Sequence, residues 1–258
     1  MNLTNNTILI TGGTSGFGYE FAARLLALGN TVLITGRNAA KLEETKTKLP
    51  GIHTFVSDVS NPDAIRALYD VVVGQFPSLN MIINNAGEMR IISLHDNYPL
   101  EDITREIEIN LMGPVRMVQQ FLPHLKTKSN AAILNVTSGI AVAPFAISPI
   151  YSATKSGLRS YTKLLRVQLG KTNVKVFELI APGSSTALGD KFKALDGYDD
   201  KIAMDPVKLI DVAIKGLQND TFEIYPGMAK MLRIMSRLAP AFLLKQMAKV
   251  GASFYLKP

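Results

Sequence analysis

Residues 7–18 read TILITGGTSGFG, and this stretch decides the fold. Its first half is a run of β-branched and aliphatic residues that predicts a buried strand. Gly12, Gly16 and Gly18 then lie in the turn that opens a helix predicted over 17–28. Glycines in such a turn let the backbone approach a pyrophosphate closely, and the helix N-terminus offers free N–H groups. A tight strand-to-helix turn without a ligand is the alternative interpretation.

Beyond this stretch, short apolar runs alternate with longer helical patterns along the 258 residues. This alternation predicts βα units that form a parallel sheet covered on both faces. The predicted strands are 7–12, 31–36, 52–57, 81–85, 131–138, 174–180 and 221–226, and the predicted helices include 17–28, 61–75, 100–125, 152–170 and 206–218. We therefore expect a single α/β domain with a doubly wound, parallel, seven-stranded sheet and helices on both faces.

Composition narrows the class of protein. Hydrophobic residues make up 47% and charged residues 19%, which is ordinary for a soluble globular domain. The N-terminal MNLTNNTILITGG resembles neither a signal peptide nor a membrane span, so the cytoplasm is the expected compartment. The absence of cysteine excludes disulfides and thiolate chemistry, and the three histidines lack ligand spacing, so no metal site is expected.

The net charge of +7 is concentrated at the C-terminal end. No acidic residue follows Glu223, whereas six basic residues do: Lys230, Arg233, Arg237, Lys245, Lys249 and Lys257. The basic character therefore belongs to the tail, and no nucleic-acid partner is expected.

The ends of the second and third predicted strands carry possible cofactor contacts. The second ends in Gly36-Arg37, where a carboxylate would bind the ribose 2′-hydroxyl of NAD and an arginine can pair with the 2′-phosphate of NADP. Arg37, with the hydroxyls of Thr14 and Ser15, thus favours NADP, and a solvated loop arginine is the alternative. Asp58 can accept a hydrogen bond from adenine, or it simply begins the next loop.

Tyr151 and Lys155 are four residues apart on a predicted helix, so their side chains share one face. A nearby ammonium favours the phenolate and makes proton exchange with an alcohol or ketone practicable. This spacing alone is common in helices. Ser138, at the carboxyl end of the fifth predicted strand, can hold a carbonyl oxygen, and Asn110 can join a proton relay, although helical asparagines are often incidental.

In order and spacing, these motifs resemble the short-chain dehydrogenase/reductase (SDR) family across residues 7–227. The resemblance rests on TGGTSGFG, Asp58, the NNAG segment 84–87, Asn110, Ser138, Tyr151, Lys155 and Pro182-Gly183. Among SDR proteins, Arg37 resembles the NADP-preferring type. The chain is also similar to poorly characterised bacterial oxidoreductases of this family that carry a basic, methionine-rich C-terminal end.

The resemblance implies a Rossmann-like fold with NADP (NADPH) as cofactor, NAD being less favoured. It implies that Tyr151 is the general acid/base, that Lys155 binds the nicotinamide ribose and lowers the tyrosine pKa, and that Ser138 orients the substrate. Asn110 completes the relay. The implied cofactor contacts are Gly12, Thr14, Ser15, Gly16, Phe17, Gly18, Arg37, Asp58, Val59, Asn85, Ala86, Gly87, Tyr151, Lys155, Pro182, Gly183, Ser185 and Thr186.

The sequence departs from the family pattern after the Pro-Gly turn. The family usually has a threonine five residues after the proline, where it contacts the nicotinamide carboxamide. Here Thr186 comes four residues after Pro182. Either the turn is one residue tighter or Ser185 takes this place.

The substrate side is expected to be hydrophobic. The resemblance places the apolar stretch between Ser138 and Tyr151 beside the substrate, so it implies substrate contacts at Phe145, Pro149 and Ile150. Residues 187–204 form either a lid or a mobile surface loop.

Two units are expected, a catalytic domain over 1–227 and a C-terminal extension over 228–258. The extension predicts two amphipathic helices separated at Pro240 and ending at Gly251. It can pack on a partner subunit, cover the substrate pocket or lie on an anionic membrane, and packing is favoured.

The predicted function is that of an NADP(H)-dependent oxidoreductase, a homodimer or homotetramer, that transfers hydride between nicotinamide and a carbonyl or alcohol carbon. A non-catalytic dinucleotide-binding sensor or scaffold is the alternative. An isomerase or dehydratase on the same fold is a third interpretation.

Overall fold

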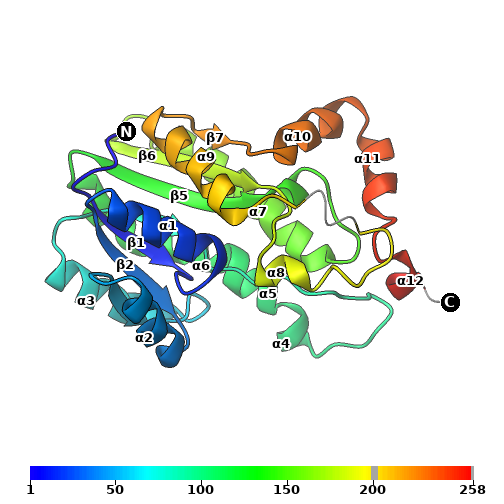
Figure 1. Cartoon of the computed structure of the whole chain (residues 1–258), viewed down its shortest axis with the longest axis horizontal. Helices are drawn as coiled ribbons and strands as arrows, with labels where there is room; N and C mark the ends of the chain where they lie inside the picture. Colours follow the sequence, from blue (N-terminus) through cyan, green and yellow to red (C-terminus); the bar gives the residue numbers. More distant parts are fainter. Residues whose placement is uncertain (199–202, 257–258) are drawn as a thin grey trace.

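A computed structural model describes residues 1–198 and 203–256 of the chain. Residues 199–202, within the lid candidate, and Lys257 and Pro258 of the tail lie outside the described residues. The described part confirms the predicted seven-stranded parallel sheet (Figure 1). Its strands are β1 (Thr7–Thr11), β2 (Thr31–Gly36), β3 (His53–Val56), β4 (Leu79–Asn84), β5 (Ala131–Ser138), β6 (Val174–Ala181) and β7 (Glu223–Ile224).

The strand order is β3-β2-β1-β4-β5-β6-β7, and every neighbouring pair is parallel. The chain runs outward in one direction from β1 to β3 and then returns to place β4 on the other side of β1. Open α/β sheets bind ligands at the carboxyl ends of the strands where the order reverses. The fold thus places a ligand crevice beside the ends of β1 and β4.

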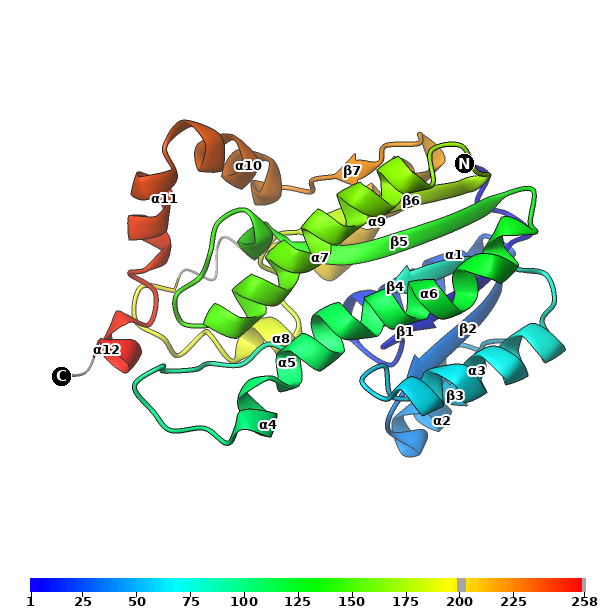
Figure 2. The ribbon, with the colours of Figure 1, turned by 180° about the vertical axis from the view of Figure 1, so that it is seen from behind.

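Helices cover both faces of the sheet (Figures 1 and 2). One face carries α1 (Gly16–Ala27), α2 (Ala39–Lys48) and α9 (Pro206–Gln218), and its core includes Phe21 and Phe177. The opposite face carries α3 (Pro62–Gln75), α6 (Gly113–Lys126) and α7 (Pro149–Gln168), with Phe121 in its core. This double cover explains why all the residues of β1 and β5 are buried.

Side-chain caps fix where several helices begin. The Asn38 side chain accepts a hydrogen bond from the Lys41 N–H (3.1 Å) at the start of α2. Asn61 and Asp205 cap α3 and α9, and each is followed by a proline in the first turn. Capping residues satisfy N–H groups that have no partner within the helix, and proline there loses no hydrogen bond. Sequence alone therefore sets these boundaries.

The helix predicted over 100–125 is not continuous. The structure divides it into α4 (Leu100–Ile103), α5 (Arg105–Ile107), a π-helical turn (η1, Glu108–Met112) and α6. Asn110 lies in the π turn, and its side chain is hydrogen-bonded to the backbone of Glu88. A π turn accommodates one extra residue in a helix and often marks a functional position.

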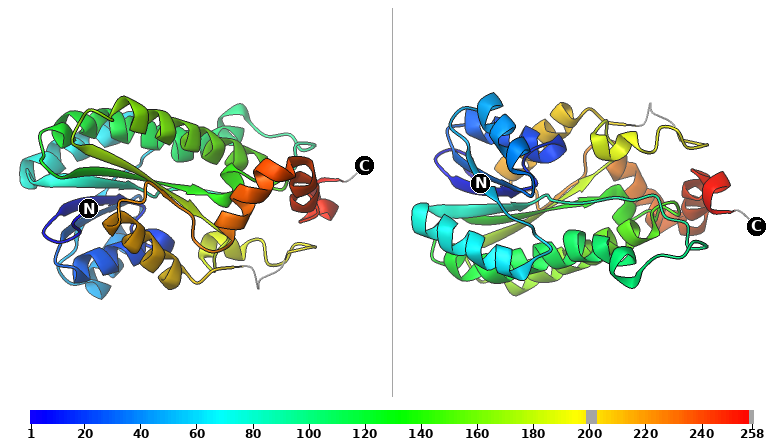
Figure 3. Two further views of the ribbon diagram at one scale, coloured as in Figure 1. Left: turned by 90° about the horizontal axis from the view of Figure 1, so that it is seen from above. Right: turned by 90° about the horizontal axis from the view of Figure 1, so that it is seen from below.

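The tail forms three short helices at the end of the molecule where the strands terminate (Figure 3). They are α10 (Met228–Leu238), α11 (Pro240–Met247) and α12 (Ala252–Tyr255). Pro240 begins α11 as predicted, but the chain does not end its helical structure at Gly251. Gly251 has a positive φ of 67° and starts α12 instead. Among the helices of the described residues, none is both long and apolar enough to span a bilayer.

Candidate active site

A cavity of about 680 Å³ lies at the carboxyl end of the sheet. It extends from Arg37 and Asp58 past the glycine turn to Tyr151 and then to residues of the tail such as Met247. It therefore crosses the point between β1 and β4 at which the strand order reverses. Of the eighteen residues predicted to contact the cofactor, all but Gly18 and Ser185 line this cavity.

The glycine turn between β1 and α1 forms one wall. Gly12 and Gly16 have φ angles of 68° and 53°, a conformation that favours glycine. A Cβ added at Gly18 would lie 2.2 Å from the Gly12 carbonyl oxygen, so Gly18 lets α1 pack against the turn without itself reaching the cavity. The N-cap residue Ser15 makes no capping hydrogen bond through its side chain, which leaves first-turn N–H groups of α1 available to a ligand.

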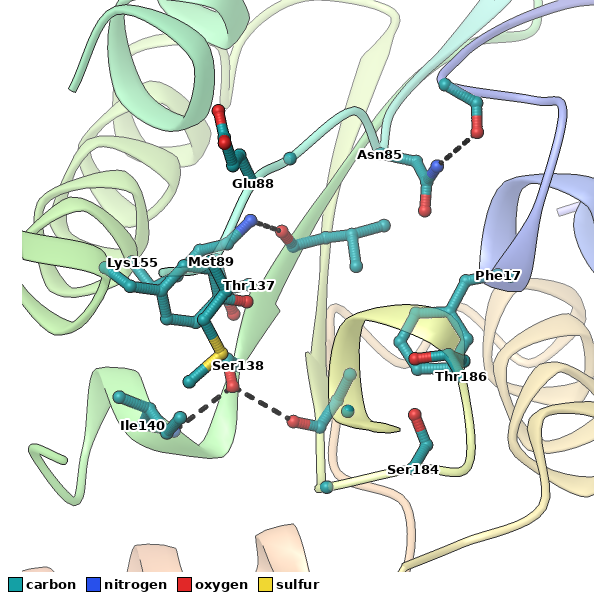
Figure 4. A pocket seen from close by; sticks show the side chains of 18 of the residues that line it. Phe17, Asn85, Glu88, Met89, Thr137, Ser138, Ile140, Lys155, Ser184 and Thr186 are labelled. Atoms are coloured by element: carbon teal, nitrogen blue, oxygen red, sulfur yellow. Dashed lines mark hydrogen bonds between the residues drawn. The ribbon is translucent and has the colours of Figure 1, made fainter. Parts of the chain in front are cut away.

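The NNAG segment after β4 holds the end of β1 in place. The Asn85 side chain donates hydrogen bonds to the carbonyl oxygens of Thr11 and Gly12, both at 3.0 Å (Figure 4). The Thr11 hydroxyl accepts hydrogen bonds from the backbone N–H groups of Asn85 and Ala86, both at 3.1 Å. These contacts fix the glycine turn against the end of β4.

Ser138, Tyr151 and Lys155 meet in the middle of the cavity. Ser138 ends β5, and Tyr151 and Lys155 project from one face of α7. All three are buried and line the cavity. The Lys155 ammonium donates a hydrogen bond to the Val136 carbonyl (2.9 Å) and lies 5.6 Å from the centre of the Tyr151 ring. The Ser138 hydroxyl accepts a hydrogen bond from Ile140 N–H (3.3 Å; Figure 4).

Burial controls the titration of this group of residues. Removal from water raises the pKa of Tyr151, a hydrogen bond with the Ser138 hydroxyl opposes the rise, and the Glu106 carboxylate adds to it. Burial lowers the pKa of Lys155 to about 8. Desolvation of the phenolate is thus the largest influence on the Tyr151 pKa, and the opposing hydrogen bond comes from Ser138 rather than from Lys155.

Asn110 does not line the cavity but supports its wall. The Asn110 Oδ1 accepts a hydrogen bond from the Glu88 N–H (2.8 Å), and Nδ2 donates to the Glu88 carbonyl (2.7 Å) and to Thr154 Oγ1 (3.3 Å). A Cβ added at Gly87 would lie 3.2 Å from Asn110 Oδ1 and 3.7 Å from Lys155 Nζ. Asn110 therefore holds the backbone beside Lys155.

At the far end of the cavity, an arginine follows β2 and an aspartate follows β3, as expected from the sequence. Arg37 is exposed and lines the cavity with Thr14 and Ser15. Among the described lining residues, the carboxylates are Asp58 and Glu88. Asp58 both lines the cavity and begins a turn, because its Oδ1 accepts hydrogen bonds from the Ser60 N–H (2.9 Å) and hydroxyl (2.7 Å).

The segment after β6 brings Thr186 rather than Ser185 to the cavity. Pro182, Gly183 and Thr186 line it, and Thr186 Cγ2 would be 3.7 Å from a Cβ added at Gly16. Ser185 is directed elsewhere, with its N–H donating to the Met204 carbonyl (3.4 Å). Thr186 thus faces the glycine turn despite being one residue out of register with the family pattern.

Two of the three predicted substrate contacts do not line the cavity. Phe145 does, but Pro149 and Ile150 are in the first turn of α7, and neither lines it. Successive residues of a helix are separated by about 100° around its axis. Because Tyr151 faces the cavity, the residues one and two positions before it are directed away. Pro149 and Ile150 therefore lie outside the lining of this cavity.

Sequence reasoning also missed most of the apolar lining. The apolar and aromatic residues that were missed are Met89, Ile140, Phe192, Tyr198, Met228, Leu232, Met247 and Val250. Several of these residues belong to the lid candidate and the tail. In those segments, an apolar residue at helical spacing predicts burial but does not indicate which part of the protein it packs against. The methionine-rich amphipathic pattern of the tail was the one available signal.

Comparisons with known proteins agree with this geometry. The sequence profile described as short chain dehydrogenase matches residues 6–194. The chain is 39% identical over 250 residues to DltE, an uncharacterised oxidoreductase of Bacillus subtilis (strain 168), which covers 96% of this chain and 98% of that protein.

Two solved structures are similar in fold. One is a short chain dehydrogenase from Burkholderia cenocepacia J2315 in complex with NADP, with a TM-score of 0.82, 21% identity and coverage of 96% of this chain and 99% of that chain. The other is a short chain dehydrogenase/reductase from Burkholderia phymatum in complex with NAD, with a TM-score of 0.81, 20% identity and coverage of 92% and 95%. The fold thus occurs with either dinucleotide. From the match over residues 6–194 and the kinship with the Bacillus protein, we conclude that this chain belongs to the short-chain dehydrogenase family of oxidoreductases.

Proposed function

We propose that the protein is an NADP(H)-dependent oxidoreductase that interconverts a carbonyl compound and the corresponding alcohol. The observation that carries this proposal is the meeting of Ser138, Tyr151 and Lys155 in one cavity with the glycine turn. A hydroxyl, a phenol and an ammonium placed together can bind a carbonyl oxygen and deliver a proton to it.

The lining residues fit a dinucleotide. The available N–H groups of α1 at Gly16 suit the pyrophosphate, and Arg37 suits the 2′-phosphate of NADP. Lys155 would hold the nicotinamide ribose, and Thr186 the carboxamide. When bound, the nicotinamide supplies a hydride for reduction or accepts one in oxidation.

The protein itself handles the oxygen of the substrate. The Ser138 hydroxyl would hold the carbonyl oxygen, and the Tyr151 hydroxyl would transfer its proton to that oxygen as the carbonyl carbon is reduced. Because burial raises the pKa of Tyr151, the hydroxyl is protonated at neutral pH and ready to donate. The Lys155 ammonium would stabilise the phenolate that remains, and in oxidation the same groups act in reverse.

Asn110 would act as a positioning residue. Its side chain is fully used in binding the Glu88 backbone and Thr154, so it keeps the chain beside Lys155 in place. Asn110 would therefore act on the reaction without contacting the substrate or the cofactor.

The pH dependence follows from Lys155. Its ammonium is charged below its pKa of about 8 and neutral above it, so its interactions with the cofactor ribose and with the phenolate weaken as pH rises. We expect kcat/KM for NADPH, at saturating carbonyl substrate, to be level below about pH 8 and to fall above it. The Lys155→Arg variant should move the falling limb to higher pH, because guanidinium stays charged. A wild-type profile that is level to pH 10 would contradict this role.

The family resemblance also implies a homodimer or homotetramer formed through two helices, the one predicted over 100–125 that contains Asn110 and the one that contains Tyr151, α7. Leu164 and Val167 of α7 are 59% and 77% exposed, which supports a partner surface on this helix. Light scattering of the purified protein should give two or four times the chain mass of 28.1 kDa.

The activity is tested directly with a panel of aldehydes, ketones and alcohols, with NADPH and NADH measured in parallel. We expect oxidation of NADPH that depends on a carbonyl compound, with the alcohol as product. Cofactor binding without turnover across the whole panel would favour the sensor interpretation and overturn the proposal.

A further inference from the structure

The tail helices help to enclose the proposed reaction centre. Met228 and Leu232 of α10, Met247 at the end of α11, and Val250 after it all line the same cavity as Tyr151. Figures 2 and 3 show these helices across the end of the molecule at which β5 and β6 terminate. The tail is therefore a wall of the cavity.

The contact between the tail and the reaction centre is close. A Cβ added at Gly139 would lie 2.9 Å from Leu232 Cδ1, so a side chain at position 139 would collide with Leu232. Gly139 directly follows Ser138, the residue proposed to hold the carbonyl oxygen. Leu232 thus packs against the residue that follows Ser138.

The tail is also attached to the lid candidate. The Gly251 N–H donates to the Asp196 carbonyl (2.9 Å), and the Ser253 hydroxyl donates to Asp196 Oδ1 (2.7 Å). At its other end, the Arg233 guanidinium lies 4.6 Å from the centre of the Tyr225 ring, just before α10. The Asp196 contacts hold the end of the tail against the segment before residue 199, and the Arg233 contact holds α10 against the chain that follows β7.

The compartment under the tail is apolar except at one end. Its apolar walls are Met89, Ile140, Phe145, Phe192, Met228, Leu232, Met247 and Val250. The Phe145 and Phe192 rings are 5.8 Å apart. The hydroxyls of Ser138 and Tyr151 provide the polar end. Of the charged lining residues nearby, Glu88 is paired with Arg105 (2.7 Å), and Lys191 is exposed to solvent.

We infer that the tail forms the roof of the substrate compartment and makes the enzyme selective for carbonyl compounds or alcohols with an extended apolar body. The inference rests on the proposed function for the reaction itself. A polar group along the body of the substrate would lose its hydration without gaining a partner, whereas each buried methylene adds favourable free energy. Methionine side chains adapt to different shapes, so the roof selects for apolar character more than for one outline.

The first test is a series of unbranched aldehydes of four to ten carbons. We expect kcat/KM to rise about threefold to fourfold for each added methylene until the compartment is full. Leu232→Asn should flatten this rise while leaving the KM for NADPH unchanged. The matched control is Ile234→Asn on the same helix, because Ile234 is 49% exposed and does not line the cavity. Leu232→Ala, with its melting temperature measured, serves if the asparagine variant fails to fold.

A second readout does not need turnover. N-phenyl-1-naphthylamine, a neutral apolar fluorophore, should bind to the wild-type protein and be displaced better by the ten-carbon aldehyde than by the four-carbon one. Loss of this discrimination in Leu232→Asn, but not in Ile234→Asn, would support the roof. Length-dependent displacement without reduction of any aldehyde would support the roof and overturn the proposed function. Reduction at a rate independent of chain length, or equal effects of the two variants, would overturn the roof.

Discussion

Replacing Tyr151 with phenylalanine is expected to lower kcat for carbonyl reduction by about 10²- to 10⁴-fold, the usual contribution of a general acid. Phenylalanine keeps the ring within the same buried wall of α7 but removes the hydroxyl that donates the proton. Ser138 would still bind the carbonyl oxygen, but it cannot replace a proton donor supported by Lys155. Steady-state assays at saturating NADPH and carbonyl substrate give kcat directly.

The control is Tyr161→Phe on the same helix. Tyr161 packs against the hydrophobic core and does not line the cavity. Loss of its hydroxyl should therefore leave kcat within about twofold of the wild-type value. Binding of NADPH, followed by fluorescence titration, and the melting temperature should be similar in both variants. Full activity of Tyr151→Phe would refute the assignment of Tyr151 as the acid.

The Arg37→Ala variant should bind NADPH about 10- to 100-fold more weakly and bind NADH almost as before, because only NADPH has a phosphate for the guanidinium to contact. The exposed position of Arg37 at the end of β2, without a carboxylate beside it, is the basis of this prediction. Dissociation constants for both cofactors, measured by titration at fixed ionic strength, separate the two effects.

Arg66→Ala is the matched control for that experiment. Arg66 is an exposed arginine of α3, paired with Asp63 at 2.7 Å, and it does not line the cavity. The Arg66→Ala variant tests whether removing a positive charge elsewhere on the surface weakens NADPH binding to the same degree as Arg37→Ala. An Arg37→Ala variant that weakens NADPH and NADH equally, or a wild-type protein that prefers NADH, would contradict the assignment of NADP.

The central part of the site was predictable because its elements follow from local rules. The glycine turn, the end of β5 and the spacing of Tyr151 and Lys155 are each visible in the sequence. Parallel strands bring their carboxyl ends to one edge, so the fold itself gathers these groups. The residues predicted to contact the cofactor therefore gather around one cavity, and Gly18 and Ser185 are the ones that do not line it.

Other features depend on contacts between distant segments. The π turn at Asn110 coincides with hydrogen bonds between its side chain and the backbone of Glu88, 22 residues earlier, which no local pattern reveals. The helix α2 was absent from the predicted set because AAKLEETKTK contains little apolar periodicity, and only Leu42 and Thr45 of it are buried. Propensity and capping at Asn38, rather than an apolar stripe, define this helix.

The substrate side was the least predictable part. Pro149 and Ile150 are close to Tyr151 in sequence, but their positions around α7 keep them out of the cavity lining. The tail was predicted to be amphipathic, and its sequence was equally consistent with covering a pocket, a partner subunit or a membrane. Only the fold shows that Leu232 and Met247 lie over the cavity.

The most direct test of the central claim follows the transferred hydrogen. NADPH that carries deuterium at both C4 positions is incubated with the protein and an accepted aldehyde or ketone, and the alcohol is examined by mass spectrometry and NMR. We expect one deuterium on the carbinol carbon for each NADPH oxidised, with the hydroxyl proton coming from Tyr151, whose hydroxyl exchanges with solvent. Product that forms without deuterium, or without consumption of NADPH, would contradict it and point to an isomerase or dehydratase.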